Sequence, residues 1–281
     1  MPCRRSQPTA FLCSLPRGSF GGLTVRNGAS GMEAHRYGNG PVRAVLIHGW
    51  FGDAHDFDAM LAAIDPEIFS FACIEFRGYG ERKGEPGPYD VATIARDAVA
   101  LADTLGWKQF DVVGHSMGGK AALRVAVEVP ERVGKLCGIA PVWAGRSPFD
   151  EQRLDLFHKA RDAVGVRQGI IANTTGGRLP PIWSRRVAEH SMRTSDPDAF
   201  ATYFASWALE DFAREAATVT AETLVIVGAH DPGITEAVAR ATWLTTLPQA
   251  RLVVLPDSGH YPLNECPLIL AAHLTGFLAP T

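Results

Sequence analysis

The residues best suited to chemistry lie in the stretch from Phe110 to Lys120, which reads F-D-V-V-G-H-S-M-G-G-K. An apolar run that ends in glycine, serine and two more glycines before a helical pattern predicts a strand, a sharp turn and a helix. Gly114, Ser116 and Gly118 fill the G-x-S-x-G pattern, in which small flanking residues let the serine occupy a strained turn. Such a turn exposes the hydroxyl and aims the first amides of the helix at the group it attacks. The pattern predicts a nucleophilic Ser116; the alternative is a glycine-rich turn that only joins strand to helix.

A serine nucleophile needs a base and an acid, and two later strand ends supply them. Asp231 and His260 each follow an apolar run, and the order Ser, Asp, His is the one that this kind of sheet uses for a serine triad. In this interpretation His260 takes the proton of Ser116, and Asp231 orients the imidazole and stabilises its charged form. Alone, each could be an ordinary loop residue, and Asp257 is a weaker alternative partner for the histidine. Their joint placement with Ser116 favours a catalytic triad.

A second turn offers a donor for developing negative charge. The apolar run from Val42 to Ile47 leads directly into His48 and Gly49. A glycine there lets the backbone turn tightly enough to point an amide into a pocket, and the amide of Trp50 is the natural candidate.

The elements that must position these residues alternate between strands and helices. Apolar runs predict strands at 42–47, 69–76, 133–142, 223–227 and 251–255, and another strand that begins at Phe110. Amphipathic patterns between them predict helices, the clearest running from Val91 to Leu105 behind an Asp90 cap. Strands that are apolar throughout are covered on both faces, so the fold class is α/β, with a doubly wound, mostly parallel sheet. Ligands bind beyond the carboxyl ends of such strands, where Ser116 and Trp50 lie.

The rhythm changes between residues 146 and 220, where helical patterns replace strands. Because strands resume afterwards, we expect a helical lid inserted at 146–220 into a core formed by 23–145 and 221–281. Residues 1–22 contain three arginines and no acidic residue. We expect a disordered extension there, either a targeting sequence or an overextended start.

Composition excludes several classes of protein. The 281 residues are 46% hydrophobic and 20% charged, which fits a globular protein with an ample core. A net charge of −3 and the lack of a basic stripe argue against a nucleic-acid partner, and no apolar run approaches the roughly 20 residues that span a membrane. Five scattered cysteines without C-x-x-C spacing predict neither a disulfide framework nor a zinc site, and fit a cytoplasmic location.

Several motifs together resemble a known family. They are His48-Gly49-Trp50, Arg77-Gly78-Tyr79-Gly80, Gly114-His115-Ser116-Met117-Gly118-Gly119, Gly228 to Asp231, and Gly259-His260 with Glu265 and Pro267. From about Met32 to Leu278 the chain resembles the α/β-hydrolase fold superfamily, in its lidded branch of small esterases, lactonases, C–C hydrolases and cofactor-free haloperoxidases. The resemblance implies that the amides of Met117 and Trp50 form an oxyanion hole and that the lid shapes specificity. Around Arg77-Gly78-Tyr79-Gly80 the family often has Asp and Ser at two positions where this chain has Glu75 and Arg82.

The leading hypothesis is a serine hydrolase that cleaves a small carboxylic ester or lactone through an acyl-enzyme, without metal or cofactor. Trp143, Trp207 and Tyr261 are candidates for lining an apolar substrate pocket. Two alternatives remain open: a C–C bond hydrolase or perhydrolase on the same triad, and a non-catalytic ligand-binding member of the fold. The identity of the substrate and the oligomeric state do not follow from the sequence.

Overall fold

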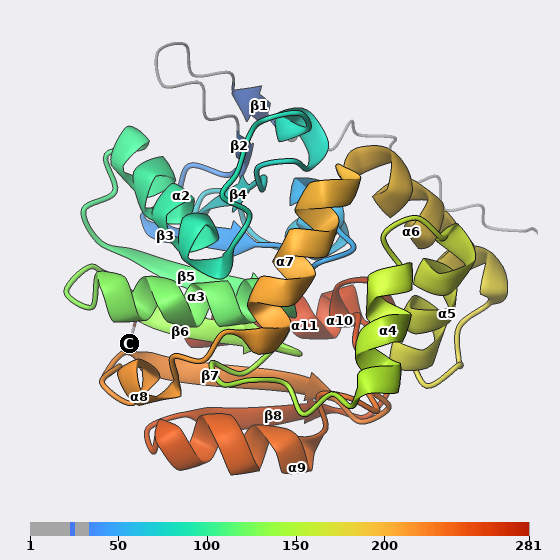
Figure 1. Cartoon of the computed structure of the whole chain (residues 1–281). Helices are drawn as coiled ribbons and strands as arrows, with labels where there is room; N and C mark the ends of the chain where they lie inside the picture. Colours follow the sequence, from blue (N-terminus) through green and yellow to red (C-terminus); the bar gives the residue numbers. More distant parts are fainter. Residues whose placement is uncertain (1–22, 26–33, 281) are drawn as a thin grey trace, which may run out of the picture.

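The strands of the chain assemble into one sheet in a computed structural model that describes residues 23–25 and 34–280 (Figure 1). Within these residues the sheet has eight strands in the order β1-β2-β4-β3-β5-β6-β7-β8. The strands are β1 Leu23–Val25, β2 Ala34–Tyr37, β3 Val42–Ile47, β4 Phe69–Ile74, β5 Phe110–His115, β6 Val133–Ile139, β7 Glu222–Gly228 and β8 Arg251–Leu255. All neighbouring strands from β4 across to β8 are parallel. At the other edge, β2 is antiparallel to both β4 and β1. This confirms the predicted doubly wound, mostly parallel α/β fold.

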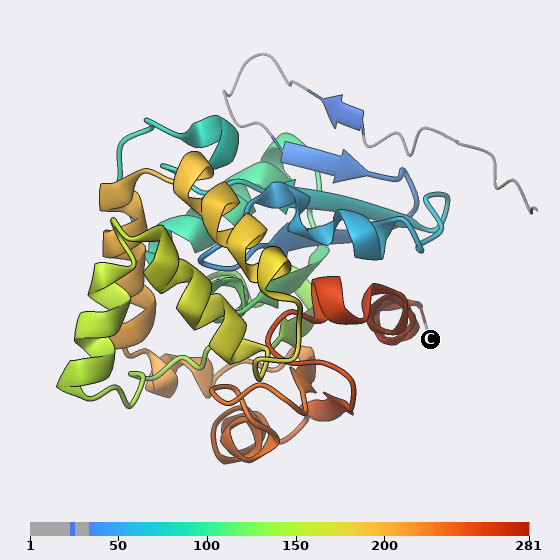
Figure 2. The ribbon, with the colours of Figure 1, turned by 90° about the vertical axis from the view of Figure 1, so that its right-hand side faces the viewer.

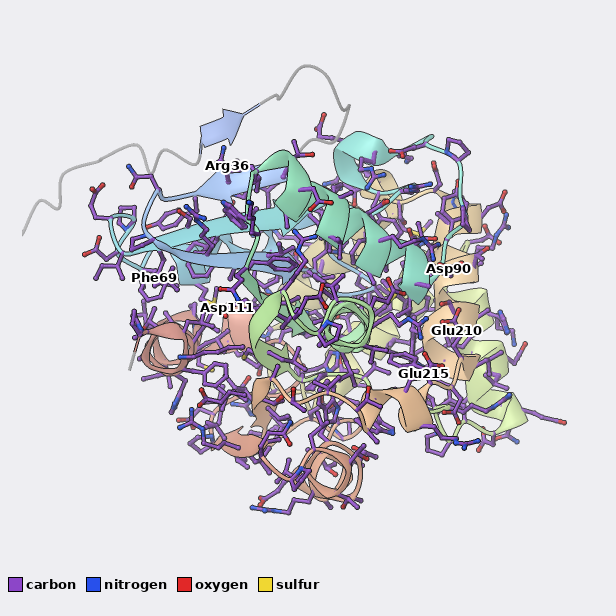
Figure 3. All side chains as sticks on the ribbon, turned by 90° about the vertical axis from the view of Figure 1, so that its left-hand side faces the viewer. Arg36, Phe69, Asp90, Asp111, Glu210 and Glu215 are labelled. Carbon is purple, nitrogen blue, oxygen red and sulfur yellow. The ribbon has the colours of Figure 1, made fainter. Side chains whose placement is uncertain are left out.

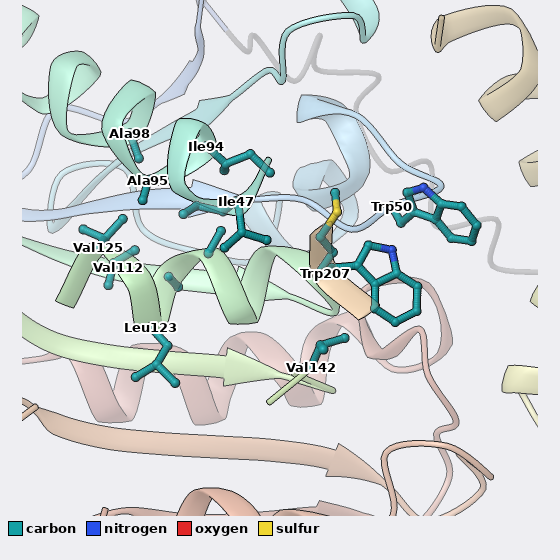
Figure 4. Close-up of a cluster of buried hydrophobic side chains, with 14 of the residues drawn as sticks. Ile47, Trp50, Ile94, Ala95, Ala98, Val112, Leu123, Val125, Val142 and Trp207 are labelled. Carbon is teal, nitrogen blue, oxygen red and sulfur yellow. The ribbon is translucent and has the colours of Figure 1, made fainter. Parts of the chain in front are cut away.

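Alternate residues of the central strands divide between two hydrophobic cores, one on each face of the sheet. The first core lies under α2 (Val91–Thr104) and α3 (Met117–Glu128), and the second under α1 (Asp58–Leu61) and α11 (Pro267–Leu278). On β3, for example, Val45 packs in the first core and its neighbour Leu46 in the second. Figure 4 shows part of the first core, which contains Ile94 of α2 and Leu123 of α3. Burial on both faces explains why these strands read as continuous apolar runs.

The chain between β6 and β7, all of it described, carries five helices. They are α4 Glu151–Lys159, α5 Val164–Thr174, α6 Pro181–Thr194, α7 Pro197–Leu209 and α8 Ala213–Ala216. Figure 1 shows α4, α5 and α6 beyond the ends to which β7 and β8 point, and Figure 2 views the molecule from that side. We call residues 146–220 the helical insertion.

Five short elements complete the described part of the chain. They are the 3₁₀ turns η1 Ala54–Phe57 and η2 Gly80–Arg82, helix α9 Glu236–Ala239, the π-helical turn η3 Arg240–Leu244, and α10 Pro262–Glu265. Helix α9 continues directly into η3, so the helical segment after β7 contains a π-helical turn. Asp90 caps α2 as predicted, because its carboxylate accepts the amide of Thr93 at 2.6 Å (Figure 3).

Other expectations meet the limits of the described residues. The expected N-terminal extension, residues 1–22, lies outside them, as do Cys3 and Cys13. The described cysteines, Cys73, Cys137 and Cys266, are free thiols. Within the described part of the chain, every helix is too short or too polar to cross a bilayer.

The turn between β5 and α3 depends on a very close approach of backbones. Ser116 has φ +56° and ψ −119°, a conformation that costs a non-glycine residue energy. A Cβ on Gly114 would lie 2.0 Å from the carbonyl oxygen of Gly118, and one on Gly118 would lie 2.2 Å from that of Ile47. Glycine at both positions therefore allows β3, β5 and α3 to meet beneath the serine.

A buried lysine on α3 binds the backbone just before the helical insertion and at the end of α7. Lys120 is fully buried, and its ammonium donates to the carbonyls of Gly145 at 3.2 Å, Trp207 at 2.9 Å and Glu210 at 2.7 Å. Gly145 directly precedes the insertion, whereas Trp207 and Glu210 lie at the end of α7 and just after it. All three N–H groups of the ammonium are satisfied, which is what burial of a cation requires.

The glycine packing predicts that Gly118→Ala destabilises the protein by about 2–3 kcal/mol, because the new methyl group would force backbone to move. The matched control is Gly169→Ala in the middle of α5, where an added Cβ meets nothing within 4 Å. That change should stabilise the protein by about 0.5–1 kcal/mol, since alanine favours helix. Urea unfolding measures both. Equal stability of Gly118→Ala and the wild type would contradict the packing argument.

The lysine contacts predict that Lys120→Met lowers the free energy of unfolding by about 1–3 kcal/mol, because three carbonyls lose a charged donor. Exposed Lys108→Met, whose side chain has no hydrogen bond or ion pair among the described residues, is the control and should change stability by less than about 0.5 kcal/mol. Thermal unfolding measures the stability of both variants. In limited proteolysis, the first cleavage of the Lys120→Met protein should fall within residues 146–220.

Candidate active site

The structure brings Ser116, Asp231 and His260 together at the carboxyl edge of the sheet. Nε2 of His260 lies 2.9 Å from Oγ of Ser116, and Nδ1 lies 2.5 Å from Oδ2 of Asp231. The three residues follow β5, β7 and β8, strands that are far apart in the sequence and neighbours or near neighbours in the sheet. This arrangement can pass a proton from the hydroxyl to the imidazole while a carboxylate balances the charge that the ring gains.

The environment of Asp231 keeps its carboxylate ionised. Its other oxygen, Oδ1, accepts the amides of Gly233 at 2.8 Å and Ile234 at 3.0 Å. Burial pushes the pKa of Asp231 upward, but the charge and hydrogen bond of His260 and these two amides outweigh it and lower the pKa. Asp257, the alternative partner, is not the residue that binds the imidazole. Its backbone carbonyl instead accepts a hydrogen bond from Arg178 at 3.1 Å.

Two backbone amides in the turns near Ser116 have no hydrogen-bond acceptor among the described residues. Met117 is the first residue of α3, so its amide has no acceptor within the helix. The turn after β3 lies against the same point, because a Cβ on Gly49 would sit 3.4 Å from Cβ of Ser116. The amide of Trp50, the next residue, has no acceptor among the residues that the structure describes. An oxyanion formed on Ser116 is the kind of acceptor these amides can serve.

The side chain of Trp50 fixes the turn that carries its amide. Nε1 donates to the carbonyl of Phe200 at 2.8 Å, and the indole stacks on the Phe200 ring with 4.1 Å between centroids. On the other side the hydroxyl of Tyr79 donates to the carbonyl of Trp50 at 3.0 Å. Helix α7 of the insertion therefore helps to hold the turn in place.

The two departures from the family motif have structural partners. Glu75 pairs with His48 at 3.1 Å beneath this turn; burial would lower the pKa of His48, but the carboxylate raises it overall. Arg82 is buried and pairs with Asp97 at 2.8 Å, and Asp97 also binds Arg77 at 2.8 Å. The changed loop is thus tied to α2 by a buried pair of charges.

His115 contacts the backbone of His260, which the sequence analysis did not predict. Its Nε2 lies 2.7 Å from the carbonyl oxygen of His260. Complete burial, with the nearby charge of His260, lowers the pKa of His115 to about 3. The ring is therefore neutral and carries its proton on Nε2, where it donates to that carbonyl. The motif contained this histidine, but only the fold shows what it contacts.

The three candidate pocket residues belong to the first core or pack against it, but each has a different aromatic neighbour. Trp207 of α7 packs with Trp50 at 5.7 Å between ring centroids, and Figure 4 labels both side chains. Tyr261 lies beside His260 at 5.4 Å. Trp143 packs edge-on against Trp243 at 5.4 Å. Tyr261 is thus the candidate in direct contact with a triad residue.

The side chains close enough to share a metal ion, among the described residues, are His35, His55 and Asp58. Both histidines already bind the carboxylate of Asp58, at 2.7 Å and 3.1 Å, and the hydrogen bond to Asp58 raises the pKa of His55 to about 8. This group lies on β2 and on the η1–α1 segment, and it shares no residue with the site around Ser116.

Comparison with known proteins places this geometry in context. A pimeloyl-(acyl-carrier protein) methyl ester esterase of Nitrosomonas europaea is 29% identical over 244 residues, which cover 82% of this chain and 92% of that protein. A 2-hydroxymuconate semialdehyde hydrolase of Pseudomonas putida is 28% identical over 237 residues, covering 77% and 76%. The solved structure of an esterase from Exiguobacterium antarcticum superposes with a TM-score of 0.76 at 21% identity, covering 88% of this chain and 96% of that one.

The family model described as the alpha/beta hydrolase fold matches residues 45–265, from β3 to the end of α10. That span includes the serine turn, the helical insertion and both later strand ends. The sequence match and the sheet agree: this chain belongs to the alpha/beta hydrolase fold family.

Proposed function

We propose that this protein is a serine hydrolase that cleaves a small carboxylic ester or lactone through an acyl-enzyme. The observation that carries the proposal is the position of His260, whose two ring nitrogens lie within hydrogen-bond distance of Ser116 and Asp231. The strained turn at Ser116 adds support, because strain of this kind is concentrated at functional sites. Hydrolase activity is the common feature of the family and of the named relatives.

Each residue has a defined role in this mechanism. His260 Nε2 takes the proton of Ser116 while Oγ attacks the substrate carbonyl, and the amides of Trp50 and Met117 stabilise the tetrahedral oxyanion. The imidazolium, held by Asp231, then gives its proton to the leaving alkoxide as the C–O bond breaks. Water, activated by the same histidine, attacks the acyl-serine and releases the acid.

We further propose that the helical insertion is a lid that contributes to substrate selection. It supplies Phe200, Phe204 and Trp207, which pack around Trp50 next to the proposed oxyanion hole. An aromatic surface of this kind suits an apolar acyl or alcohol group. Tyr261, beside His260, adds to it from the core. The name of the Nitrosomonas europaea relative also gives an ester as its substrate, a methyl ester of a pimeloyl group on an acyl-carrier protein.

Two other functions fit the same fold. The similarity to a 2-hydroxymuconate semialdehyde hydrolase favours the alternative of C–C bond hydrolysis or perhydrolysis by the same triad. A ligand-binding protein without activity is less favoured, because the three side chains already have the hydrogen-bond geometry that catalysis needs. A substrate panel of short p-nitrophenyl esters, lactones of graded acyl length and a ring-cleavage dienoate separates these functions.

The nucleophile is tested with Ser116→Ala and a fluorophosphonate probe. The wild type should be labelled at Ser116 and hydrolyse p-nitrophenyl acetate or butyrate, and Ser116→Ala should lose at least about 10³-fold in kcat, because the attacking oxygen is gone. Peptide mapping by mass spectrometry locates the label. A wild type that neither reacts with the probe nor hydrolyses any substrate in the panel would instead support a ligand-binding function.

The acid is tested with Asp231→Asn, compared with Asp257→Asn. Replacing the carboxylate that binds Nδ1 should lower kcat by about 10⁴-fold, because the amide favours the wrong imidazole tautomer. Asp257→Asn should stay within about two-fold of the wild type, since its side chain does not bind the imidazole. Steady-state kinetics on one ester measures both, and a larger loss in Asp257→Asn would reverse the assignment.

A further inference from the structure

We propose that Arg178, in the insertion between α5 and α6, is a positioning residue for His260 and acts through Glu265. This inference rests on the proposed function, in which His260 is the general base. It assigns part of the catalytic machinery to the helical insertion and not to the core alone.

Glu265, the last residue of α10, binds the backbone on both sides of His260. Its Oε2 accepts the amide of Gly259 at 2.9 Å, and its Oε1 accepts the amide of Tyr261 at 3.1 Å. The side chain is only 1% exposed. The peptide groups that flank the histidine therefore depend on one buried carboxylate.

Arg178 supplies the cation that this carboxylate needs. Nη1 lies 3.0 Å from Oε2 of Glu265, and Nη2 donates to the carbonyl of Asp257 at 3.1 Å. Among the described residues, Arg178 is the cation that pairs with Glu265. A carboxylate removed from water is costly unless opposite charge and hydrogen bonds compensate, so the guanidinium stabilises the Glu265 side chain in the buried position where it binds both amides.

The same segment of the insertion also contacts the histidine loop through its backbone. The amide of His260 donates to the carbonyl of Thr174 at 3.0 Å. A Cβ on Gly259 would lie 2.6 Å from Cα of Thr175, so the two chains touch at that point. Residues 174–178 thus form one wall of the loop, and Arg178 provides its charged contact.

Loss of Arg178 should affect the chemistry more than the binding of substrate. Its polar contacts are with Glu265 and Asp257, and it has none with Ser116 or Asp231. Without the cation, the buried carboxylate of Glu265 loses its charged partner, and its hold on the amides beside His260 weakens. A shift of the imidazole by a fraction of an ångström lowers the rate steeply, because proton transfer requires close alignment.

The test compares Arg178→Gln with Arg185→Gln in the full-length protein. Arg185 is an exposed arginine on α6 whose side chain has no hydrogen bond or ion pair among the described residues, so it matches the change in charge. In Arg178→Gln we expect kcat to fall about 10- to 100-fold, KM to stay within two-fold, and fluorophosphonate labelling of Ser116 to slow by a similar factor. Arg178→Lys, which restores a cation, should recover at least part of kcat. Arg185→Gln should match the wild type.

A second readout does not depend on catalysis. The Cε1–H resonance of His260, assigned by its loss in His260→Gln, should change its chemical shift in Arg178→Gln and should be unchanged in Arg185→Gln. If the wild type neither hydrolyses esters nor reacts with the probe, the proposed function fails, and this resonance alone decides the role of Arg178. Unchanged kcat, or an unchanged His260 resonance in a folded Arg178→Gln protein, would overturn the inference.

Discussion

The close contact between the backbones of β3, β5 and α3 is the constraint on which the rest of the site depends. Gly118 has no room for a side chain because Ile47 approaches it, and Gly114 has none because Gly118 does. Only with those backbones in contact does Ser116 take up its strained conformation, with the first amide of α3 beside it. The energetic cost of this strain is met by the two cores on either side of the sheet, which hold the three elements together.

The helical insertion is bound to this site through buried polar groups as well as through aromatic packing. Lys120 binds the carbonyl just before the insertion and the carbonyl that follows α7, and Arg178 binds the histidine loop. Lower on the same insertion, His190 pairs with Asp53, which follows the turn of Trp50. Buried polar contacts have strict geometric requirements, so they define one docked position for the insertion more sharply than apolar packing does. The position of the insertion and the alignment of the proposed catalytic groups are therefore linked.

The two unusual residues in the loop after β4 show how a family motif tolerates change. The larger Glu75 reaches His48 and pairs with it, and its oxygen would lie 2.1 Å from a Cβ on Gly80. Arg82 brings a charge into the interior, and Asp97 of α2 neutralises it. Burial alone would raise the pKa of Asp97, but the hydrogen bond from Arg77 and the charge of Arg82 outweigh it and lower the pKa. Each departure is thus matched by a partner elsewhere in the chain.

The sequence by itself determined the sheet, the strand order in the chain and the turns where Ser116, Asp231 and His260 lie, because these depend on local patterns of apolar residues and glycines. It favoured Asp231 over Asp257 as partner of the histidine but left Asp257 as an alternative, since both lie near strand ends. Only the tertiary structure decided that choice, by placing β7 beside β8 so that one carboxylate reaches Nδ1.

The tertiary structure also shows the contacts of four residues that the sequence did not single out for a role: His115, Lys120, Arg178 and Glu265. Each acts through contacts with residues that lie elsewhere in the chain or through loop geometry that no periodic pattern encodes. Local sequence specifies which elements form. Long-range packing specifies which buried charges and dipoles meet, and it is those contacts that complete the site.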